Sequence, residues 1–244
     1  MIANMHPLPK LSLLSLCFLL LLVPTARAQG VFATDCNRTE RKPLDPVVMP
    51  GMPGMSHMHD FFGPNRVADS AKPADLLSGP NSCSLPTDHS AYWMPSMYDN
   101  YRLVDGQQLQ AYYNFLGGEI PIPRGLVMIA GDATRAKTNP DWSSWSCWPG
   151  GTYKLVLPPS CTQKDHWLLS EVDFPSCWDG KHLDSANHKS HVTYPQRDYT
   201  CPRTHPVRIP RLVLFRNFVA EPAWNGFSRN IFLASGPAGS LHAD

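Results

Sequence analysis

The sequence predicts a mainly β protein, folded as a single sandwich-like domain whose long loops are held by disulfides. Three observations favour this class. The 25 prolines and 16 glycines of the 244 residues are spread along the chain, where they interrupt long helices. The apolar segments are short and rich in β-branched and aromatic residues, as strands are. Six of the seven cysteines lie beyond the N-terminal apolar segment, an even number that suits three disulfides.

The chain begins with the three parts of a secretory signal peptide. A short segment ending in Lys10 precedes the apolar run Leu11–Val23, and the small residues Ala26 and Ala28 predict cleavage before Gln29. The apolar run is shorter than the roughly 20 residues that a membrane-spanning helix needs. We therefore predict a secreted or extracytoplasmic protein, with periplasm and cell wall as open alternatives, and no membrane span after cleavage.

Residues 1–28 are thus predicted to be the signal peptide, and residues 29–244 one domain with its core at about 45–220. Cleavage removes Lys10 and Arg27, so the 21 basic residues become 19, against 20 acidic residues. This balance gives no electrostatic reason to expect nucleic acid or an anionic membrane as a partner.

Short apolar segments predict six strands. The clearest has a period of two, in which Leu109, Ala111, Tyr113 and Phe115 share one face. The predicted strands are Ala91–Tyr98, Gln108–Phe115, Leu126–Ala130, Tyr153–Leu157, His166–Phe174 and Leu212–Phe218.

Two segments outside these strands carry weaker signals. Asp69–Leu77 predicts a short helix that either ends at Pro73 or begins there. The tail Ala234–Asp244 is rich in glycine, alanine and serine, and we expect it to be frayed.

The cysteine spacings are long and irregular, without a C-x-x-C, which disfavours a zinc ribbon or a thioredoxin-like redox site. Six cysteines allow 15 pairings. Pairing of Cys147 with Cys161 is favoured because the two flank the turn-rich segment Trp148–Gly151. The cysteines predicted to form disulfides are Cys36, Cys83, Cys147, Cys161, Cys177 and Cys201.

The first candidate site segment holds His57, His59 and Asp60 after a stiff loop of prolines and glycines. In an extended backbone the two histidines project to the same side, where they suit a metal or one substrate. Asp60 would orient one of the rings. The alternative is that these histidines hydrogen-bond loop carbonyls and only hold the loop together.

The second segment, residues 174–191, concentrates polar residues that suit proton transfer and binding of a negative charge. Its candidate catalytic residues are Asp179, Asp184, His188, Lys189 and His191. For both carboxylates the alternative is a turn or a cap.

Three further residues are candidates for substrate binding: Trp93, Trp178 and His205. The alternative for the tryptophans is a place in the core, and a single histidine such as His205 is usually structural. If a divalent metal is bound, the candidate ligands are His57, His59, His188 and His191.

Five blocks of the sequence, in order, resemble the secreted domain-of-unknown-function family DUF1996, whose members occur in fungi and bacteria. Some members carry carbohydrate-binding modules, so the resemblance implies an extracellular setting and points to polysaccharide. Where the family commonly has asparagine, this chain has His182, which makes that histidine the least suited to act. The blocks are 45–63, Ser90–Pro95, Leu126–Asp132, 174–191 and Cys201–Pro206.

These features favour a hydrolase or lyase that acts on an extracellular polysaccharide through a histidine and aspartate site. A non-catalytic module that binds glycan or a cell-surface partner is the alternative, and a protein with a metal bound by a histidine cluster is the third possibility. The sequence has no G-x-S-x-G, H-E-x-x-H, P-loop or G-x-G-x-x-G motif, which disfavours the common esterase, zincin and nucleotide chemistries.

Overall fold

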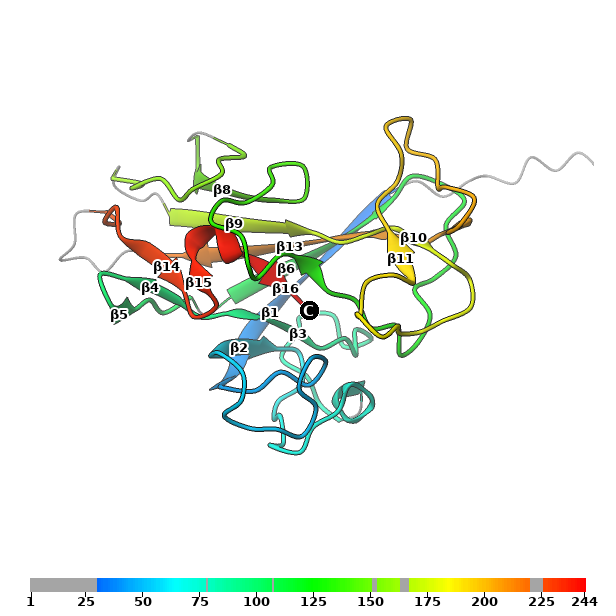
Figure 1. The fold of residues 1–244 in the computed structure, drawn as a ribbon, viewed down its shortest axis with the longest axis horizontal. Coiled ribbons are helices and arrows are strands. Elements are labelled where there is room, and N and C mark those ends of the chain that lie inside the picture. Colours follow the sequence, from blue (N-terminus) through cyan, green and yellow to red (C-terminus); the bar gives the residue numbers. More distant parts are fainter. Residues whose placement is uncertain (1–29, 78, 107, 151–152, 163–166, 220–225) are drawn as a thin grey trace, which may run out of the picture.

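The computed structural model describes residues 30–77, 79–106, 108–150, 153–162, 167–219 and 226–244 (Figure 1). The predicted signal peptide, 1–28, and its cleavage point before Gln29 lie outside the described residues. Among the residues described, no helix is long and apolar enough to cross a membrane.

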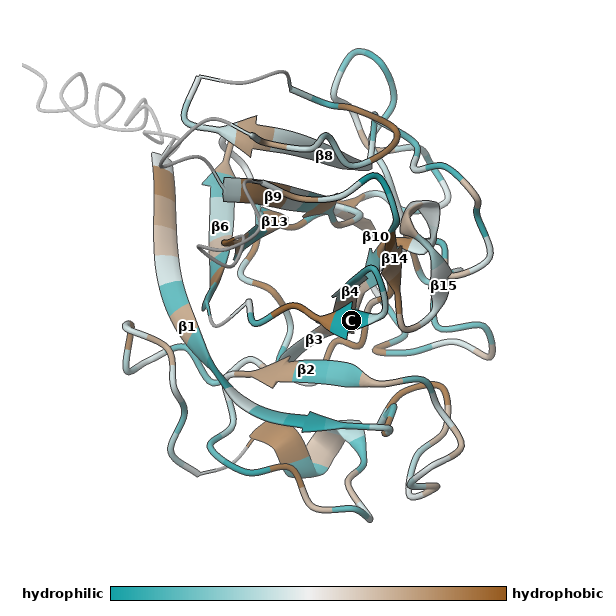
Figure 2. Cartoon of the chain, turned by 90° about the vertical axis from the view of Figure 1, so that its left-hand side faces the viewer, coloured by the Kyte–Doolittle hydropathy of each residue, from teal (hydrophilic) through white to brown (hydrophobic). Residues whose placement is uncertain are grey.

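A seven-stranded antiparallel sheet forms the larger part of the fold, in the order β3-β2-β1-β6-β13-β9-β8. Figure 2 shows this sheet curling around the interior. Its strands are β1 (Gly30–Lys42), β2 (His59–Phe62), β3 (Tyr92–Pro95), β6 (Gln108–Phe115), β8 (Ser143–Trp148), β9 (Trp167–Asp173) and β13 (Arg211–Phe218).

Smaller sheets and two short 3₁₀ helices, η1 (Pro73–Leu77) and η3 (Ala238–Ser240), complete the described fold. The sheet β15-β14-β4-β5 contains β4 (Met97–Asp99), β5 (Arg102–Leu103), β14 (Ile231–Leu233) and β15 (Gly236–Pro237). The sheet β11-β10-β12 contains β10 (Cys177–Trp178), β11 (Val192–Thr193) and β12 (Val207–Arg208). The pair β16-β7 joins β16 (His242–Ala243) to β7 (Ala130–Gly131).

The main hydrophobic core lies between the large sheet and the four-stranded sheet. The period of two in β6 places Leu109, Ala111 and Tyr113 in this core, as predicted. From the four-stranded sheet, Met97 and Leu233 reach the same cluster. The mainly β prediction is confirmed, because antiparallel sheets with a shared core make up most of the regular secondary structure of the described fold.

The predicted strands agree with the structure where one face is buried. Gln108–Phe115 is β6, Leu212–Phe218 lies within β13, and His166–Phe174 contains β9, with His166 itself outside the described residues. Ala91–Tyr98 is divided into β3 and β4 at Ser96, whose N–H donates to the Met58 carbonyl.

Two predicted strands were wrong. Only Ala130 of Leu126–Ala130 is in a strand, because Val127 donates to Leu183 in a loop instead of joining a ladder. In Tyr153–Leu157 only one bridge forms, between Leu155 and Trp145. Both segments are apolar enough to suggest strands but lack a strand partner along their length.

The tail Ala234–Asp244, expected to be frayed, is instead ordered and largely buried in β15, η3 and β16. Its small residues allow a close approach: a Cβ on Gly239 would overlap the backbone at Ala136 and Lys137. The predicted short helix begins at Pro73 rather than ending there, and it is a 3₁₀ helix.

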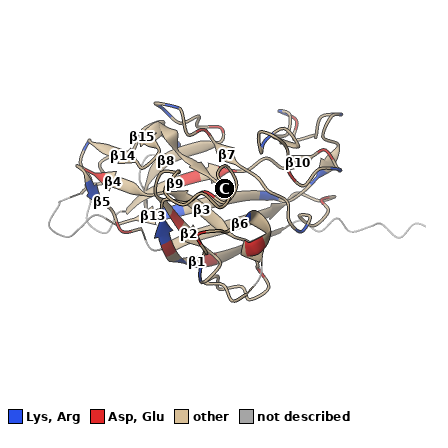
Figure 3. Cartoon of the chain, turned by 60° about the horizontal axis from the view of Figure 1, so that its bottom comes forward, with Lys and Arg blue, Asp and Glu red and all other residues tan. Residues whose placement is uncertain are grey.

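Three disulfides join Cys36 to Cys83, Cys147 to Cys161 and Cys177 to Cys201. The predicted pairing of Cys147 with Cys161 is confirmed, as is the participation of all six cysteines. Three such bonds indicate a protein that folds outside the cytoplasm. Basic and acidic residues are interspersed among the strands and loops (Figure 3).

Candidate functional site

Four chain segments far apart in the sequence meet around a solvent-open hollow of about 560 Å³. The loop that precedes β2 supplies His57, and the segment 186–189 supplies His188 and Lys189. Asp132 follows β7, and His242 belongs to β16. The early and late histidine segments of the sequence therefore line the same hollow.

His57 and His59 lie on the same side of an extended segment, with ring centroids 4.2 Å apart. The third ring of this cluster, His242, comes from β16, where it pairs with Gly131 of β7. The Nε2 atoms of His57 and His242 are 3.3 Å apart. His57, His59 and His242 each offer a nitrogen to this cluster, and these atoms lie within 4.8 Å of one another.

Hydrogen bonds fix which nitrogen of two rings is protonated. His59 Nδ1 lies 2.9 Å from the Leu44 carbonyl, and His242 Nδ1 lies 2.7 Å from the Ser240 carbonyl. A carbonyl only accepts, so both rings donate from Nδ1 and carry a lone pair on Nε2 when neutral. His59 Nε2 is buried and has no hydrogen-bonding partner among the described residues.

Burial keeps the three imidazoles neutral. It lowers the pKa of His57, lowers that of His59 well below 6.5, and lowers that of His242 to about 4. Only His57 is partly exposed, whereas His59 and His242 are buried. At neutral pH the rings therefore present lone pairs rather than positive charges.

Two carboxylates adjoin the histidine cluster. Asp45, His59 and Asp244 also offer ligand atoms within 4.8 Å of one another. One oxygen of Asp45 accepts from the backbone N–H groups of Val47 and Val48. Both carboxyl oxygens of Asp244 are buried without a hydrogen-bonding partner among the described residues, and burial raises the pKa of this group well above 3.8.

His188, which also lines the hollow, is paired with Asp184. Its Nδ1 lies 2.8 Å from Oδ1 and 3.1 Å from Oδ2 of that carboxylate. His188 has a φ of 55°, a left-handed conformation that costs non-glycine residues energy and occurs often at functional sites. The neighbouring Lys189 donates from Nζ to the Gly131 carbonyl at 2.9 Å.

Asp60 does not orient either histidine. It is fully buried and forms ion pairs with Arg41 and Arg216, and Ser96 donates to it at 3.1 Å. Arg216 is itself almost fully buried. The geometry therefore gives Asp60 a structural place within the large sheet, beside the site but not in it.

Asp179 and Trp178 lie away from the hollow. Asp179 accepts from the N–H groups of Lys181 and His182 and pairs with the His182 ring at 2.6 Å, as a turn-forming residue would. Trp178, in β10, donates from Nε1 to the His182 carbonyl.

His191 and His205 serve loop structure. His191 is buried between Ser185 and the Val127 carbonyl, 2.7 Å from its Nε2. His205 contacts the Ser190 carbonyl at 3.0 Å through Nε2. Of the four predicted metal ligands, His57 and His59 lie together, His188 lines the same hollow as His57, and His191 is not among the lining residues.

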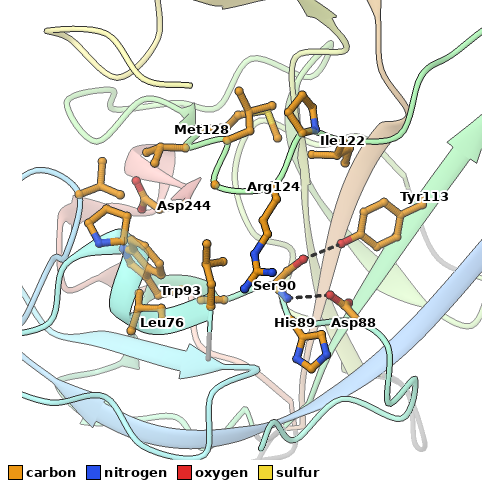
Figure 4. Close-up of a pocket in the computed structure, with 18 of the residues that line it drawn as sticks. Leu76, Asp88, His89, Ser90, Trp93, Tyr113, Ile122, Arg124, Met128 and Asp244 are labelled. Atoms are coloured by element: carbon orange, nitrogen blue, oxygen red, sulfur yellow. Dashed lines mark hydrogen bonds between the residues drawn. The ribbon is translucent and has the colours of Figure 1, made fainter. Parts of the chain in front are cut away.

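Trp93 lines a second hollow of about 540 Å³. Figure 4 shows Trp93 and Asp244 near each other in this hollow, with Arg124 extending toward Ser90. Asp244 lines both hollows, so the two adjoin at this residue. Trp93 is 3% exposed, so little of its side chain is available to a ligand.

The sequence analysis missed His242, Asp244 and Asp132 as site residues. His242 and Asp244 lie in the tail expected to be frayed, in a segment where small residues dominate and no motif marks the histidine. One signal of a buried strand was present in this tail: the residues on either side of His242, Leu241 and Ala243, are apolar.

The fold and the site define a disulfide-bonded extracytoplasmic β domain with a histidine-lined hollow. Residues 45–244 match the model of the family described as "Domain of unknown function (DUF1996)", and the chain belongs to that family. The matched region contains every residue of the hollow. No curated protein matches the chain, and no solved structure does.

Proposed function

We propose that this domain cleaves an extracellular polysaccharide, as a hydrolase or a lyase, in the hollow between His57 and His188. One observation carries the proposal: His188, which is paired with Asp184, lines the same solvent-open hollow as His57 and His242. The disulfides support an extracellular setting, in which polysaccharides are abundant substrates.

His188 is suited to proton transfer. Asp184 accepts from Nδ1, which leaves a lone pair on Nε2 and orients the ring. In hydrolysis, Nε2 takes a proton from water as the water oxygen attacks the anomeric carbon; the glycosidic C–O bond breaks, and the departing oxygen takes a proton from a solvent water molecule. In a lyase, Nε2 takes the proton from carbon, and the C–O bond breaks as the double bond forms.

Lys189 and the second hollow extend the proposal to binding. The Lys189 ammonium group lines the hollow and would attract the carboxylate of an acidic sugar. Because Asp244 lines both hollows, an extended glycan that fills both would also contact Trp93. Trp178 and His205 are outside both hollows and have no place in this binding mode.

The test measures the release of reducing ends and of unsaturated products from plant, fungal and bacterial polysaccharides. His188→Asn removes the imidazole, and asparagine tolerates the left-handed backbone at this position. Because general acid–base catalysis contributes roughly 10²–10⁴-fold, we expect a rate loss of that order. His182→Asn is the matched control, since His182 pairs with Asp179 in the same way but lies outside the hollow.

Equal product release by the wild type and His188→Asn would contradict the catalytic assignment. Binding of a polysaccharide without product release by any of the proteins would instead support the alternative, a glycan-binding module.

A further inference from the structure

The buried end of the hollow has the geometry of a metal site. The Nε2 atoms of His57 and His242 are 3.3 Å apart. Two nitrogens bound to one ion at about 2.0–2.1 Å in tetrahedral geometry would be separated by roughly 3.3–3.4 Å. His59 completes a set of three imidazoles whose ligand atoms lie within 4.8 Å of one another.

The groups around the three rings are arranged as around metal ligands. A histidine that binds a metal usually donates its other ring N–H to a carbonyl or a carboxylate, which fixes the ring. His59 does so to Leu44, and His242 does so to Ser240. Both rings therefore direct their lone-pair nitrogen, Nε2, away from these carbonyls.

Hydrogen bonds within the cluster do not account for all of its buried polar atoms. His57 can donate from Nε2 to His242 Nε2, which satisfies that pair. His59 Nε2 and both carboxyl oxygens of Asp244 are still left without partners among the described residues. A buried polar group without a partner destabilises the folded state. A cation held by the three imidazoles would give His59 Nε2 a partner.

We propose that His57, His59 and His242 bind one divalent first-row transition ion. Three imidazoles suit such an ion, whereas calcium and magnesium prefer oxygen ligands alone. Asp45 and Asp244 form a second group with His59, whose ligand atoms also lie within 4.8 Å of one another, so two carboxylates adjoin the site.

The position of the site gives the ion access to solvent. His57 is partly exposed, and His57, His242 and Asp244 all line the hollow. A bound ion would act there as a Lewis acid on an oxygen of a molecule in the hollow. The metal site does not depend on the proposed cleavage of polysaccharide, because binding of the ion can be measured without a substrate.

The experiment titrates untagged, chelator-dialysed protein with Zn²⁺ by calorimetry and with Co²⁺ by visible absorption. We expect one Zn²⁺ per chain, and Co²⁺ bands typical of a low-coordinate site. His57→Ala and His242→Ala should each weaken Zn²⁺ binding at least by the 10–100-fold that loss of a supporting group costs at metal sites. Near-ultraviolet circular dichroism confirms that each variant is folded.

His188→Asn is the matched control, since His188 lines the same hollow but lies outside the ligand set. It should bind Zn²⁺ as the wild type does. Absence of stoichiometric binding by the wild type, or equal affinity in the wild type, His57→Ala and His242→Ala, would overturn the metal site. Intact metal binding combined with unchanged cleavage by His188→Asn would contradict only the proposed catalytic role.

Discussion

At the scale of single residues, the fold gives similar side chains very different surroundings. His57 and His59 are two positions apart, yet His57 reaches solvent and His59 is fully buried. His182 and His188 each pair with an aspartate, but only His188 lines a hollow. Whether a histidine–aspartate pair can act on a ligand therefore depends on its position in the fold as well as on its chemistry.

Asp60 shows how a residue inside a polar motif can be structural. Burial on its own would raise the pKa of Asp60, but the charges of Arg216 and Arg41 outweigh it and lower this pKa below 3.8. A carboxylate whose pKa is lower in the folded than in the unfolded state stabilises the fold, and its full contribution is present above the unfolded-state pKa. It loses this contribution as the pH falls through the folded pKa.

We expect Asp60→Asn to lower the free energy of unfolding at neutral pH by about 3–5 kcal/mol, because the buried Arg216 and the half-buried Arg41 lose their partner. Urea titration measures this loss. Asp69→Asn, which disrupts an exposed ion pair with Lys42, should cost no more than about 1 kcal/mol. The Asp60→Asn deficit should shrink as the pH falls below 3.8. A deficit that is independent of pH, or one equal to that of Asp69→Asn, would contradict the ion-pair explanation.

At the scale of elements, the short pair β16-β7 builds the buried end of the hollow. β16 carries His242 and is followed by Asp244, whose backbone exchanges hydrogen bonds with Trp93 of β3. Gly131 lets β16 pack closely against β7. Its φ of 78° favours glycine, and a Cβ there would overlap the backbone of Leu241 and His242. The site thus depends on a strand pair of only two residues on each side.

We expect Gly131→Ala to displace β16, because a Cβ there would overlap the Leu241 carbonyl oxygen and lie 2.7 Å from the His242 Cα. Zn²⁺ affinity should fall together with stability, as measured by calorimetry and urea unfolding. Gly118→Ala is the matched control, since its φ is also positive but its Cβ would meet no atom within 4 Å. It should cost about 1 kcal/mol of stability and leave Zn²⁺ affinity unchanged. Equal effects of the two substitutions on Zn²⁺ binding would contradict the role of β16.

At the scale of the whole molecule, local patterns predicted the parts of the fold that local physics determines. The period of two in β6 and the turn between Cys147 and Cys161 were visible in the sequence because neighbouring residues determine both. The 13-residue strand β1 was missed because its many polar side chains hide the alternation.

For the candidate site too, local geometry could be predicted from the sequence, but contacts between distant segments could not. The two-residue spacing of His57 and His59 predicted their shared side, since it needs only an extended backbone. Their meeting with His242 could not be predicted, because it depends on a pairing between residues more than a hundred positions apart in the chain. Asp60 and Asp179 were placed in the site by proximity in sequence, whereas arginines and turn amides hold them elsewhere.

The account depends most on the convergence of histidines from both ends of the domain on one ion. A crystal of the Zn²⁺-loaded protein, with diffraction recorded above and below the zinc absorption edge, tests this directly. We predict one anomalous peak about 2.0–2.1 Å from a nitrogen of each of His57, His59 and His242. A peak at another position, or no peak with His57 and His242 still hydrogen-bonded to each other, would contradict it.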